Sequence, residues 1–505
     1  MKRFYTFKMT GTTKRKGGQL DRREFLQWTA MGSAGAALSP VIEACAQLDR
    51  SIVGDGSDET QSVMILGAGI SGLVAARELK KNGIPFRIFE GAQRIGGRAL
   101  TLQEFNPASQ AVDLGAEWIS TNDEFVIGLC RELKVGLETL SVLARSPQFF
   151  QGEQVSDFES TIKSLKLADK KILEMKDRLN DSQWDAISAE EMLTDLRSAV
   201  DEKSFLWIHR MIQLEWGIDA GAMSALTLLD RFGSAPSGWR RALEKRVRLT
   251  GGMQNLAQAL YDKVSGVVPE RFVIFDHKLT AIKSRDNRLK MEFETRKGGF
   301  SIDARVVICT LPFSALREVK GIDELEFSPL KVKAIQELGY GSHGKLAVSF
   351  KDRFWQPKSP IWTGNLKSQW IWDSGSGSSG NFGTRGVLTA QLSADQGRNL
   401  GPQSMLDFKE DLKKINSAAN SEEENSQMMN WSLNPWSRGS VSYFAPGQVH
   451  AFSSTLVSPE RRGTFIFAGE HTSLSSMGTV NGAVESGIRA AIEAARFKSD
   501  FGNKF

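Results

Sequence analysis

Three glycines and one carboxylate in the first fifth of the chain have the types and spacing needed to hold a phosphate and a ribose. Gly67, Gly69 and Gly72 follow the G-x-G-x-x-G pattern. Such glycines permit a tight turn, a close backbone approach to a pyrophosphate and close helix packing. Glu90 stands at the end of the next apolar run, where a carboxylate accepts the two ribose hydroxyls and repels a ribose phosphate. These residues predict a dinucleotide site that disfavours NADP.

Positioning these groups requires a strand, a helix and a second strand. Val63–Leu66 is a short apolar run typical of a buried parallel strand. Ile70 and Ser71 then open a helix that we expect to end near Asn82, and whose first N–H groups face the phosphates. Phe86–Phe89 reads as the second buried strand. The order predicts a Rossmann-like βαβ unit, with Ile70 and Ser71 among the cofactor-binding residues.

A second glycine pair, flanked by two arginines, comes soon after Glu90. Residues 94–98 read Arg-Ile-Gly-Gly-Arg, which resembles the GG-doublet of the flavin amine oxidase superfamily. That superfamily includes monoamine oxidases, polyamine oxidases, L-amino acid oxidases and histone lysine demethylases. The resemblance implies FAD rather than NAD as the cofactor, with its pyrophosphate held near Gly91, Arg94, Gly97 and Arg98.

The resemblance covers most of the chain, from about residue 61 to residue 489. Residues 113–118 match the block beside the flavin, and residues 465–470 and 477–487 match the C-terminal blocks. In the family the acid at Glu470 binds the ribityl chain, and a helix N-terminus near Val480 stabilises negative charge at the flavin N1/O2 edge. The further cofactor-binding residues that the resemblance implies are Gly115, Ala116, Glu117, Trp118, Leu279, Trp431, Gly469, Glu470, Thr479 and Val480.

Lys345 is the expected catalytic contact. It stands at the entry to a predicted strand that runs to Phe350. In the family a lysine at this place hydrogen-bonds a water at flavin N5, so the resemblance implies that Lys345 positions water for dioxygen reduction or imine hydrolysis. Its spacing alone favours a solvated lysine at the edge of a strand, and the matched block around it favours the catalytic contact.

Three positions depart from the monoamine oxidase pattern. Ser440 stands where those enzymes carry the cysteine that tethers the flavin, and Val441 stands where a tyrosine of the amine-binding cage follows. Thr479 replaces the second aromatic residue of that cage. We therefore expect non-covalent FAD and a substrate other than a simple arylalkylamine. Trp431 and Trp436 are candidates for the walls of the substrate site, and no arginine marks a carboxylate clamp, so amines and amino acids both remain open.

The chain has 505 residues and 41% hydrophobic content, enough for two globular domains. The resemblance implies an α/β fold, α+β in its two-domain organisation, with a Rossmann-like FAD/NAD(P)-binding domain interleaved with an amine-oxidase-type substrate domain. The FAD-binding domain is expected to comprise residues 60–140, 246–325 and 430–495, and the substrate-binding domain residues 141–245 and 326–429.

Within the substrate-binding domain, the sequence distinguishes helices from loops. Residues 156–229 have apolar side chains at helical spacing, which predicts helices over the mouth of the cleft, or else ordinary core helices. Residues 374–386 are rich in glycine and serine, and residues 416–427 are polar. Both of these stretches are typical of surface loops.

Residues 1–59 read as a signal peptide and a linker. Residues 21–27 resemble the twin-arginine export motif, and the apolar stretch after them is too short and too polar for a transmembrane helix. We therefore expect export by the twin-arginine machinery, to the periplasm or outside the cell. Residues 42–45 resemble a lipoprotein processing site, which leaves a lipid anchor at Cys45 open.

Charge and cysteine content exclude other classes of protein. The net charge is +5, but residues 1–23 carry eight basic residues and one acidic residue, so the rest of the chain has a net charge of −2. This balance gives no support for nucleic-acid binding. The three cysteines and five histidines show no disulfide framework and no metal-ligand spacing. His343 and His471 flank expected flavin-site residues and read as supporting or surface groups.

Together these patterns predict an FAD-dependent amine oxidase. It would remove a hydride from the carbon beside an amine and release an imine that water hydrolyses to a carbonyl and ammonia. Dioxygen would reoxidise the FAD and yield hydrogen peroxide. The alternatives are an L-amino acid oxidase or monooxygenase, a periplasmic amine dehydrogenase that uses an electron carrier, and a non-catalytic flavin-binding scaffold.

Overall fold

A parallel sheet lies at the centre of the structure. The computed structural model describes residues 62–140, 148–150, 153–155, 158–176, 178–232, 246–265, 272–355, 361–374, 383–416 and 422–501. Five strands pair in the order β10-β2-β1-β14-β22, all of them parallel. Their bounds are β10 (Val273–Ile274), β2 (Phe86–Phe89), β1 (Val63–Leu66), β14 (Val306–Cys309) and β22 (Phe465–Phe467). The two strands expected beside the glycine motif are confirmed.

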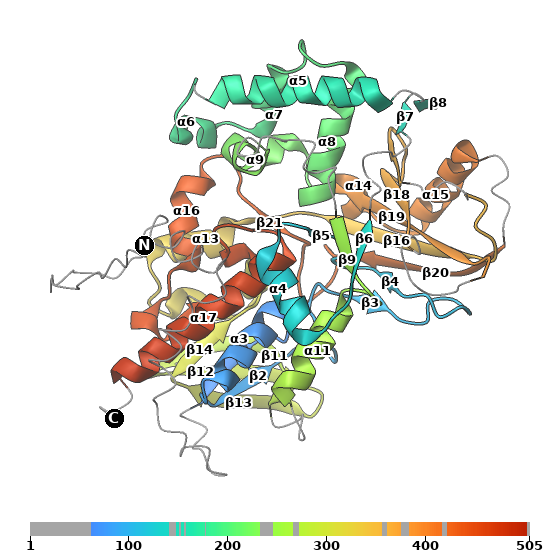
Figure 1. Cartoon of the computed structure of the whole chain (residues 1–505). Helices are drawn as coiled ribbons and strands as arrows, with labels where there is room; N and C mark the ends of the chain where they lie inside the picture. The colour runs from blue at the N-terminus through green and yellow to red at the C-terminus, as the bar shows by residue number, and fades with distance from the viewer. Residues whose placement is uncertain are drawn as a thin grey trace, which may run out of the picture.

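One face of this sheet is covered by helices (Figure 1). The helix α3 packs between α11 and α17, and α4 lies against α17. Alanines and leucines on α3 are fully buried there, among them Leu73, Ala76 and Leu79. The helix bounds are α3 (Ile70–Lys81), α4 (Glu124–Leu133), α11 (Gln254–Ser265) and α17 (Val480–Phe501).

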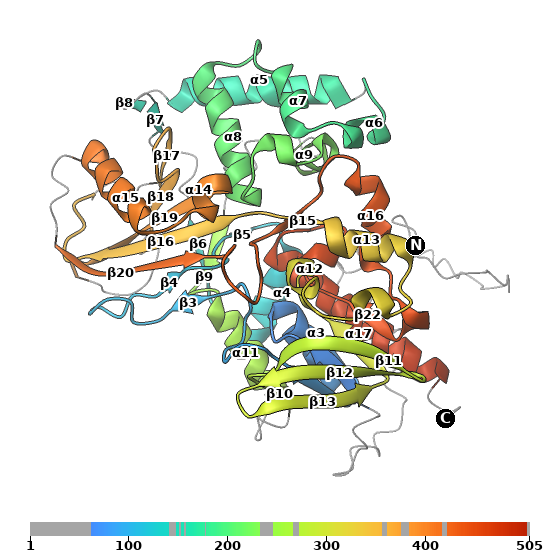
Figure 2. The same cartoon turned by 180° about the vertical axis from the view of Figure 1, so that it is seen from behind.

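A small antiparallel sheet and short helices lie on the other face (Figure 2). Met64 and Leu66 of β1 share a buried cluster with Met291 and Phe293 of the small sheet. The sheet consists of β11 (Lys278–Arg285), β12 (Arg288–Thr295) and β13 (Gly298–Ala304). The helices are α12 (Phe313–Leu316), α13 (Pro329–Glu337) and α16 (Gln448–Val457). Apolar layers on both faces explain why the parallel strands are continuously hydrophobic.

A second, seven-stranded sheet extends to one side of the first (Figure 1). Its order is β20-β16-β19-β18-β17-β7-β8. The bounds are β20 (Glu423–Asn430), β16 (His343–Phe350), β19 (Gly386–Ser393), β18 (Trp370–Asp373), β17 (Ile361–Gly364), β7 (Gln148–Phe150) and β8 (Glu153–Val155). The strands β16, β18 and β19 are buried along their whole length.

The polar stretch at residues 416–427 was expected to be a loop, and for its second half this prediction is wrong. Residues 423–427 belong to β20, which pairs with β16 at the edge of the second sheet. Most of the β20 side chains are exposed, so a polar composition is compatible with an edge strand. The other expected loop, residues 374–386, lies mostly outside the described residues.

Helices form a separate layer above the two sheets (Figure 1). Leu165, Ile172 and Met175 of α5 belong to the buried apolar cluster that these helices share. This burial supports the interpretation of the apolar pattern in residues 156–229 as ordinary core helices. Trp370 and Trp372 of β18 belong to the same cluster, so the helices pack directly on the second sheet. The bounds of these helices are α5 (Phe158–Lys176), α6 (Asp181–Ala186), α7 (Ala189–Thr194), α8 (Glu202–Trp216) and α9 (Ala225–Phe232). Two further helices, α14 (Ala394–Arg398) and α15 (Pro402–Ile415), pack on the strands of the second sheet.

Short strands connect these layers. They are β3 (Thr101–Leu102), β4 (Val112–Asp113), β5 (Ile119–Ser120), β6 (Leu137–Leu140), β9 (Arg246–Leu249), β15 (Gly339–Tyr340) and β21 (Ser442–Tyr443). The expected export motif and Cys45 lie outside the described residues. Within the residues that are described, no helix has the length and apolar character needed to cross a membrane.

Gly72→Ala tests the packing of the glycine turn. A methyl group at Gly72 would lie 2.1 Å from the carbonyl oxygen of Gly67, so we expect the turn to shift and FAD binding to weaken about tenfold or more. The matched control is Gly128→Ala, because a methyl group there meets no atom within 4 Å and should stabilise α4 by about 0.5–1 kcal/mol. Equal flavin content in the two purified variants would contradict this account.

Candidate active site

Two adjoining cavities lie where the parallel sheet meets the second sheet. The larger cavity has a volume of about 570 Å³ and the smaller one about 60 Å³. Arg98 and Trp431 line both of them. Of the expected site residues, the larger cavity is also lined by Gly115, Ala116, Glu117, Trp118, Lys345, Thr479 and Val480. The smaller cavity is also lined by Glu90, Arg94 and Gly97.

The remaining expected residues surround these cavities without lining them. Five of them lie in the turn after β1 and in the first residues of α3, and Gly469 and Glu470 follow β22. Gly91 lies against the indole of Trp436, and a methyl group added at Gly91 would lie 2.4 Å from that ring. Leu279 lies in β11, beyond both cavities. These five residues are Gly67 and Gly69 in the turn, and Ile70, Ser71 and Gly72 in α3.

The two glycine turns form a cradle suited to a pyrophosphate. Gly67 has a φ of +103°, which favours glycine. Gly69 caps α3 with an extended backbone and without a side-chain hydrogen bond, so the first N–H groups of the helix face outward. A methyl group on Gly97 would lie 3.3 Å from the Cα of Gly69. Backbone donors and the positive end of a helix therefore meet in one place, as phosphate binding requires.

Glu90 is held at the end of β2 by backbone donors. Its Oε2 accepts a hydrogen bond from the N–H of Ala68 at 2.7 Å, and its Oε1 accepts one from the N–H of Ala92 at 2.8 Å. Burial raises the pKa of this carboxyl group, while these hydrogen bonds oppose the rise. The carboxylate lines the small cavity, in a position that suits a ribose next to the pyrophosphate cradle.

Arg98 connects the second glycine turn to the C-terminal blocks. Its Nη1 donates to the carbonyl oxygen of Ser440 and to Oε1 of Glu470, both at 2.6 Å. Glu470 is buried, and its Oε2 accepts from the Ser442 hydroxyl and from the N–H of Gly478. The guanidinium group, between the two cavities, is thereby oriented by partners far apart in the sequence.

The N-terminus of α17 points its positive end at the larger cavity. The helix begins at Val480, and Thr479 caps it by accepting a hydrogen bond from the N–H of Gly482 at 3.0 Å. Both Thr479 and Val480 line the cavity. A helix dipole equivalent to about half a charge favours negative charge at this place.

Lys345 is buried in the wall of the larger cavity. Its side chain is 5% exposed, and its Nζ donates to Oε2 of Glu117 at 2.8 Å and to the carbonyl oxygen of Asp113 at 3.1 Å. The strand β16 that carries it lies between β19 and β20. A solvated lysine at a strand edge, the alternative left open by spacing, is therefore wrong.

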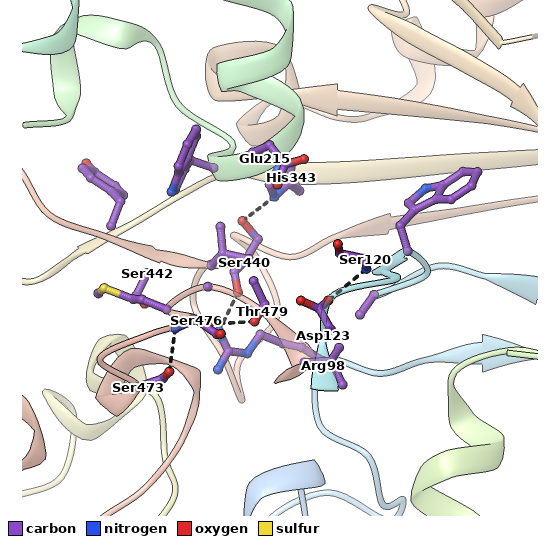
Figure 3. Close-up of a pocket in the computed structure, with 18 of the residues that line it drawn as sticks. Arg98, Ser120, Asp123, Glu215, His343, Ser440, Ser442, Ser473, Ser476 and Thr479 are labelled. Carbon is purple, nitrogen blue, oxygen red and sulfur yellow. Dashed lines mark hydrogen bonds between the residues drawn. The ribbon is translucent and has the colours of Figure 1, made fainter. Parts of the chain in front are cut away.

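The segment that passes over the site is fixed by a buried histidine. In Figure 3 the His343 ring points at Ser440, and its Nδ1 lies 2.8 Å from the Ser440 hydroxyl. The His343 Nε2 lies 3.0 Å from the carbonyl oxygen of Gln213 in α8. Burial lowers the pKa of His343 to about 4. This histidine is a supporting group, as the sequence indicated for it.

The family of the chain follows from comparison with known proteins. The model of the flavin containing amine oxidoreductase family matches residues 70–494. The chain belongs to this family. Its cofactor is FAD, as the sequence predicted. The glycine cradle suits the diphosphate of FAD, and Glu90 suits the ribose next to it.

The proteins that this amine oxidoreductase is similar to are named as oxidases of different amines. A Bacillus subtilis (strain 168) protein named "Putative L-amino-acid oxidase YobN" is 27% identical over 480 residues, which cover 87% of this chain and 96% of that protein. Cyclohexylamine oxidase from Brevibacterium oxydans IH-35A is 19% identical with a TM-score of 0.74, covering 87% of this chain and 100% of the other. Putrescine oxidase bound to putrescine is 19% identical with a TM-score of 0.73, covering 86% and 99%.

These findings establish the reaction class. The amine oxidoreductase is an FAD-dependent enzyme that oxidises the carbon–nitrogen bond of an amine or an amino acid. The mixed helix and strand architecture, with its parallel sheet, is the fold of the two solved oxidases. In the part of the chain that the structure describes, no cluster of three or more His, Cys, Asp or Glu residues is arranged to hold a metal.

Several residues of the amine oxidoreductase site were missed by sequence reasoning. Arg246 and Glu215 both line the larger cavity and form an ion pair, although no arginine had stood out as a candidate there. The sequence marks Arg246 only by its position, because it begins β9, the strand that precedes the glycines at residues 251 and 252. Trp436, which had been considered for the substrate wall, lines the small cavity with Glu90 instead.

Asp113 supports the wall below Lys345. Its Oδ1 accepts from the Thr101 hydroxyl and from the N–H of Met253. Burial, with the nearby Glu117 charge, raises the pKa of Asp113 to about 6. Asp113 therefore ties the flavin-side block to the start of α11 while its carbonyl oxygen accepts from Lys345.

His343→Asn should flatten the pH dependence of stability. Because the folded-state pKa of His343 is lowered to about 4, its stabilising contribution is complete above the unfolded value near 6.5 and is lost as pH falls toward 4. The amine oxidoreductase should lose about 3 kcal/mol of unfolding free energy from this group over that range. Urea unfolding at pH 7 and at pH 4 measures the loss in wild type and variant, and Asp113, present in both, cancels in the difference. If the unfolding free energy fell by the same amount in wild type and variant between pH 7 and pH 4, His343 would not titrate as inferred.

Proposed function

We propose that this amine oxidoreductase is an exported oxidase that passes electrons from an amine or amino acid to dioxygen and releases hydrogen peroxide. The observation that carries the proposal is the larger cavity, which places the buried Lys345 and the N-terminus of α17 on its wall. A cation and a helix dipole on one cavity suit a redox site where negative charge builds up. The bound FAD supplies the two-electron acceptor for this reaction.

The residues of the cavity align the substrate and exclude water. The substrate loses a hydride and a proton to become an imine, and water hydrolyses the imine to a carbonyl and ammonia. Dioxygen takes up the two electrons with two protons and becomes hydrogen peroxide. Trp118, Trp431 and Phe444 line the cavity with large apolar surfaces, and Lys345 has a donor with which to hold a water at the reacting face.

We also propose that the FAD is not covalently attached. The Ser440 hydroxyl lies within hydrogen-bond distance of His343 at the position where a tethering cysteine would stand. Among the described residues, neither cavity is lined by a cysteine. Cys130 and Cys309 are buried in α4 and β14.

Other acceptors and substrates define the alternatives. A dehydrogenase of this fold would pass electrons to a carrier instead of dioxygen, and an L-amino acid oxidase or monooxygenase would bind the substrate carboxylate. A non-catalytic scaffold is disfavoured because Lys345 and Glu470 keep buried polar contacts at the cavities. The named relatives include both amino-acid and amine oxidases, so both substrate classes stay within the proposal.

Lys345→Met tests the catalytic contact. Because methionine has similar length but no N–H donor, we expect flavin reoxidation or turnover to slow about tenfold or more while FAD stays bound. The reduced enzyme is mixed with oxygenated buffer in a stopped-flow instrument, and the return of flavin absorbance is followed. Lys367→Met is the control, because Lys367 pairs with Asp407 and Glu410 at the surface. An unchanged oxygen rate constant in Lys345→Met would rule out the proposed role.

Export by the twin-arginine machinery is the second part of the proposal. It is supported by Arg22 and Arg23 in a segment that resembles the export motif, and an exported flavoprotein must take up its cofactor before crossing the membrane. Cys45 is a candidate for lipid attachment after processing.

Replacing Arg22 and Arg23 together by lysine should trap active protein in the cytoplasm. The machinery recognises the arginine pair, and lysine keeps the charge while removing the guanidinium groups. Cell fractionation followed by an activity assay measures the distribution, and mass spectrometry of the mature N-terminus reports whether Cys45 carries a lipid. Undiminished activity in the periplasm would refute the assignment.

A further inference from the structure

Lys345 is joined to Glu117 by a buried ion pair that links the second sheet to the segment between β4 and β5. The Nζ–Oε2 distance is 2.8 Å, and the two side chains are 5% and 2% exposed. Glu117 lies between β4 and β5, whereas Lys345 belongs to β16 of the second sheet. Both residues line the larger cavity. The pair therefore forms part of the wall that faces the reaction.

The contacts around this pair fix the direction of the ammonium group. Of its three N–H donors, one is directed at Glu117 and one at the carbonyl oxygen of Asp113. The third remains for the cavity. Glu117 is held from its other side, because the Trp372 indole N–H donates to its Oε1 at 3.0 Å. The Trp372 ring also lies 5.1 Å from the Lys345 Nζ.

The same pair sets the charge of the cavity wall. An ammonium group alone would stabilise the negative charge that electron transfer creates, and in a buried setting that effect is strong. With a carboxylate at 2.8 Å, most of this field is cancelled. Arg248 lies 4.0 Å from Glu117, but its Nε donates to Glu138 and its Nη1 to the carbonyl oxygen of Ser374.

We propose that Glu117 is a positioning residue that orients Lys345 and keeps the cavity wall close to neutral, which limits how strongly the site favours anions and reduced oxygen. This inference rests on the proposed role of Lys345 beside the flavin. It assigns to Glu117 a function distinct from the cofactor binding that the family resemblance implies. Removing the carboxylate while keeping the shape of the side chain should therefore enhance reactivity, an outcome that loss of a purely structural contact does not produce.

The test uses sulfite, a small anion that adds to protein-bound flavin and bleaches it, on the purified holoenzyme. In Glu117→Gln the Asp113 carbonyl oxygen and the Trp372 ring still hold Lys345, so the uncancelled charge should lower the sulfite dissociation constant about fivefold or more. Lys345→Met should raise it by a similar factor, and the double variant should return close to wild type. Reoxidation of the dithionite-reduced flavin by air should be at least about threefold faster in Glu117→Gln.

The outcomes separate this inference from the proposed function. If Lys345→Met weakens sulfite binding but Glu117→Gln leaves it unchanged or weaker, Glu117 is only a structural contact and the inference is overturned. If neither single variant moves the dissociation constant, the pair is remote from the flavin and the proposed role of Lys345 fails as well.

Glu138→Gln is the matched control. It removes a carboxylate from the same buried network, but from the partner of Arg248 rather than from that of Lys345. Its sulfite dissociation constant should stay within about twofold of wild type, and a shift as large as that of Glu117→Gln would overturn the inference. If Glu117→Gln does not retain FAD, Glu117→Asp replaces it. The shorter side chain draws the carboxylate back from Lys345 and should give an intermediate tightening, whereas an unchanged constant would again overturn the inference.

Discussion

The guanidinium group of Arg98 is the interaction on which the arrangement of the site depends. It follows the second glycine turn, and one of its nitrogens donates to both Ser440 and Glu470. Glu470 follows β22, whereas Ser440 belongs to the segment that lines the larger cavity. Arg98 lies 342 residues from Ser440 and 372 residues from Glu470 in the sequence, and the three segments are thereby brought to one point. Planar donors in a fixed geometry make arginine suited to such a junction, which lysine would not reproduce.

Buried charges at this junction and around Lys345 are compensated locally. An unpaired charge in such surroundings costs several kcal/mol, and here each cation has a carboxylate within hydrogen-bond reach, Arg98 with Glu470 and Lys345 with Glu117. Replacing both partners by apolar residues could stabilise the protein. A functional explanation fits the proposed role of the site better, since Arg98, Lys345 and Glu117 line the larger cavity.

The local parts of this site were predictable from the sequence, and the long-range parts were not. The β1–α3–β2 unit was predicted because a turn, a helix and two strands are encoded within 27 residues, from Val63 to Phe89. Likewise, the helix start near Val480 was predicted because residues 477–487 resemble the C-terminal block of the family. By contrast, Lys345 and Glu117 are 228 residues apart in the chain, and nothing in either local pattern indicates the other. The edge strand β20 was missed for a related reason, because its polar side chains reflect exposure rather than turn formation.

The Ser440–His343 contact shows how the chain holds the covering segment without a covalent link. The His343 Nε2 lies near the carbonyl oxygens of Gln213 and Leu214. The Ser440 hydroxyl donates to the carbonyl oxygen of Gly341 at 2.8 Å and also lies 2.8 Å from the His343 Nδ1. A cysteine thiol at this position would be a weaker hydrogen-bonding partner for the same groups. Serine is thus matched to a buried, neutral histidine. Through that histidine, the segment over the cofactor is connected to the end of α8, where Glu215 and Trp216 line the cavity, so the cofactor side and the substrate side of the cavity are held by one hydrogen-bonded chain.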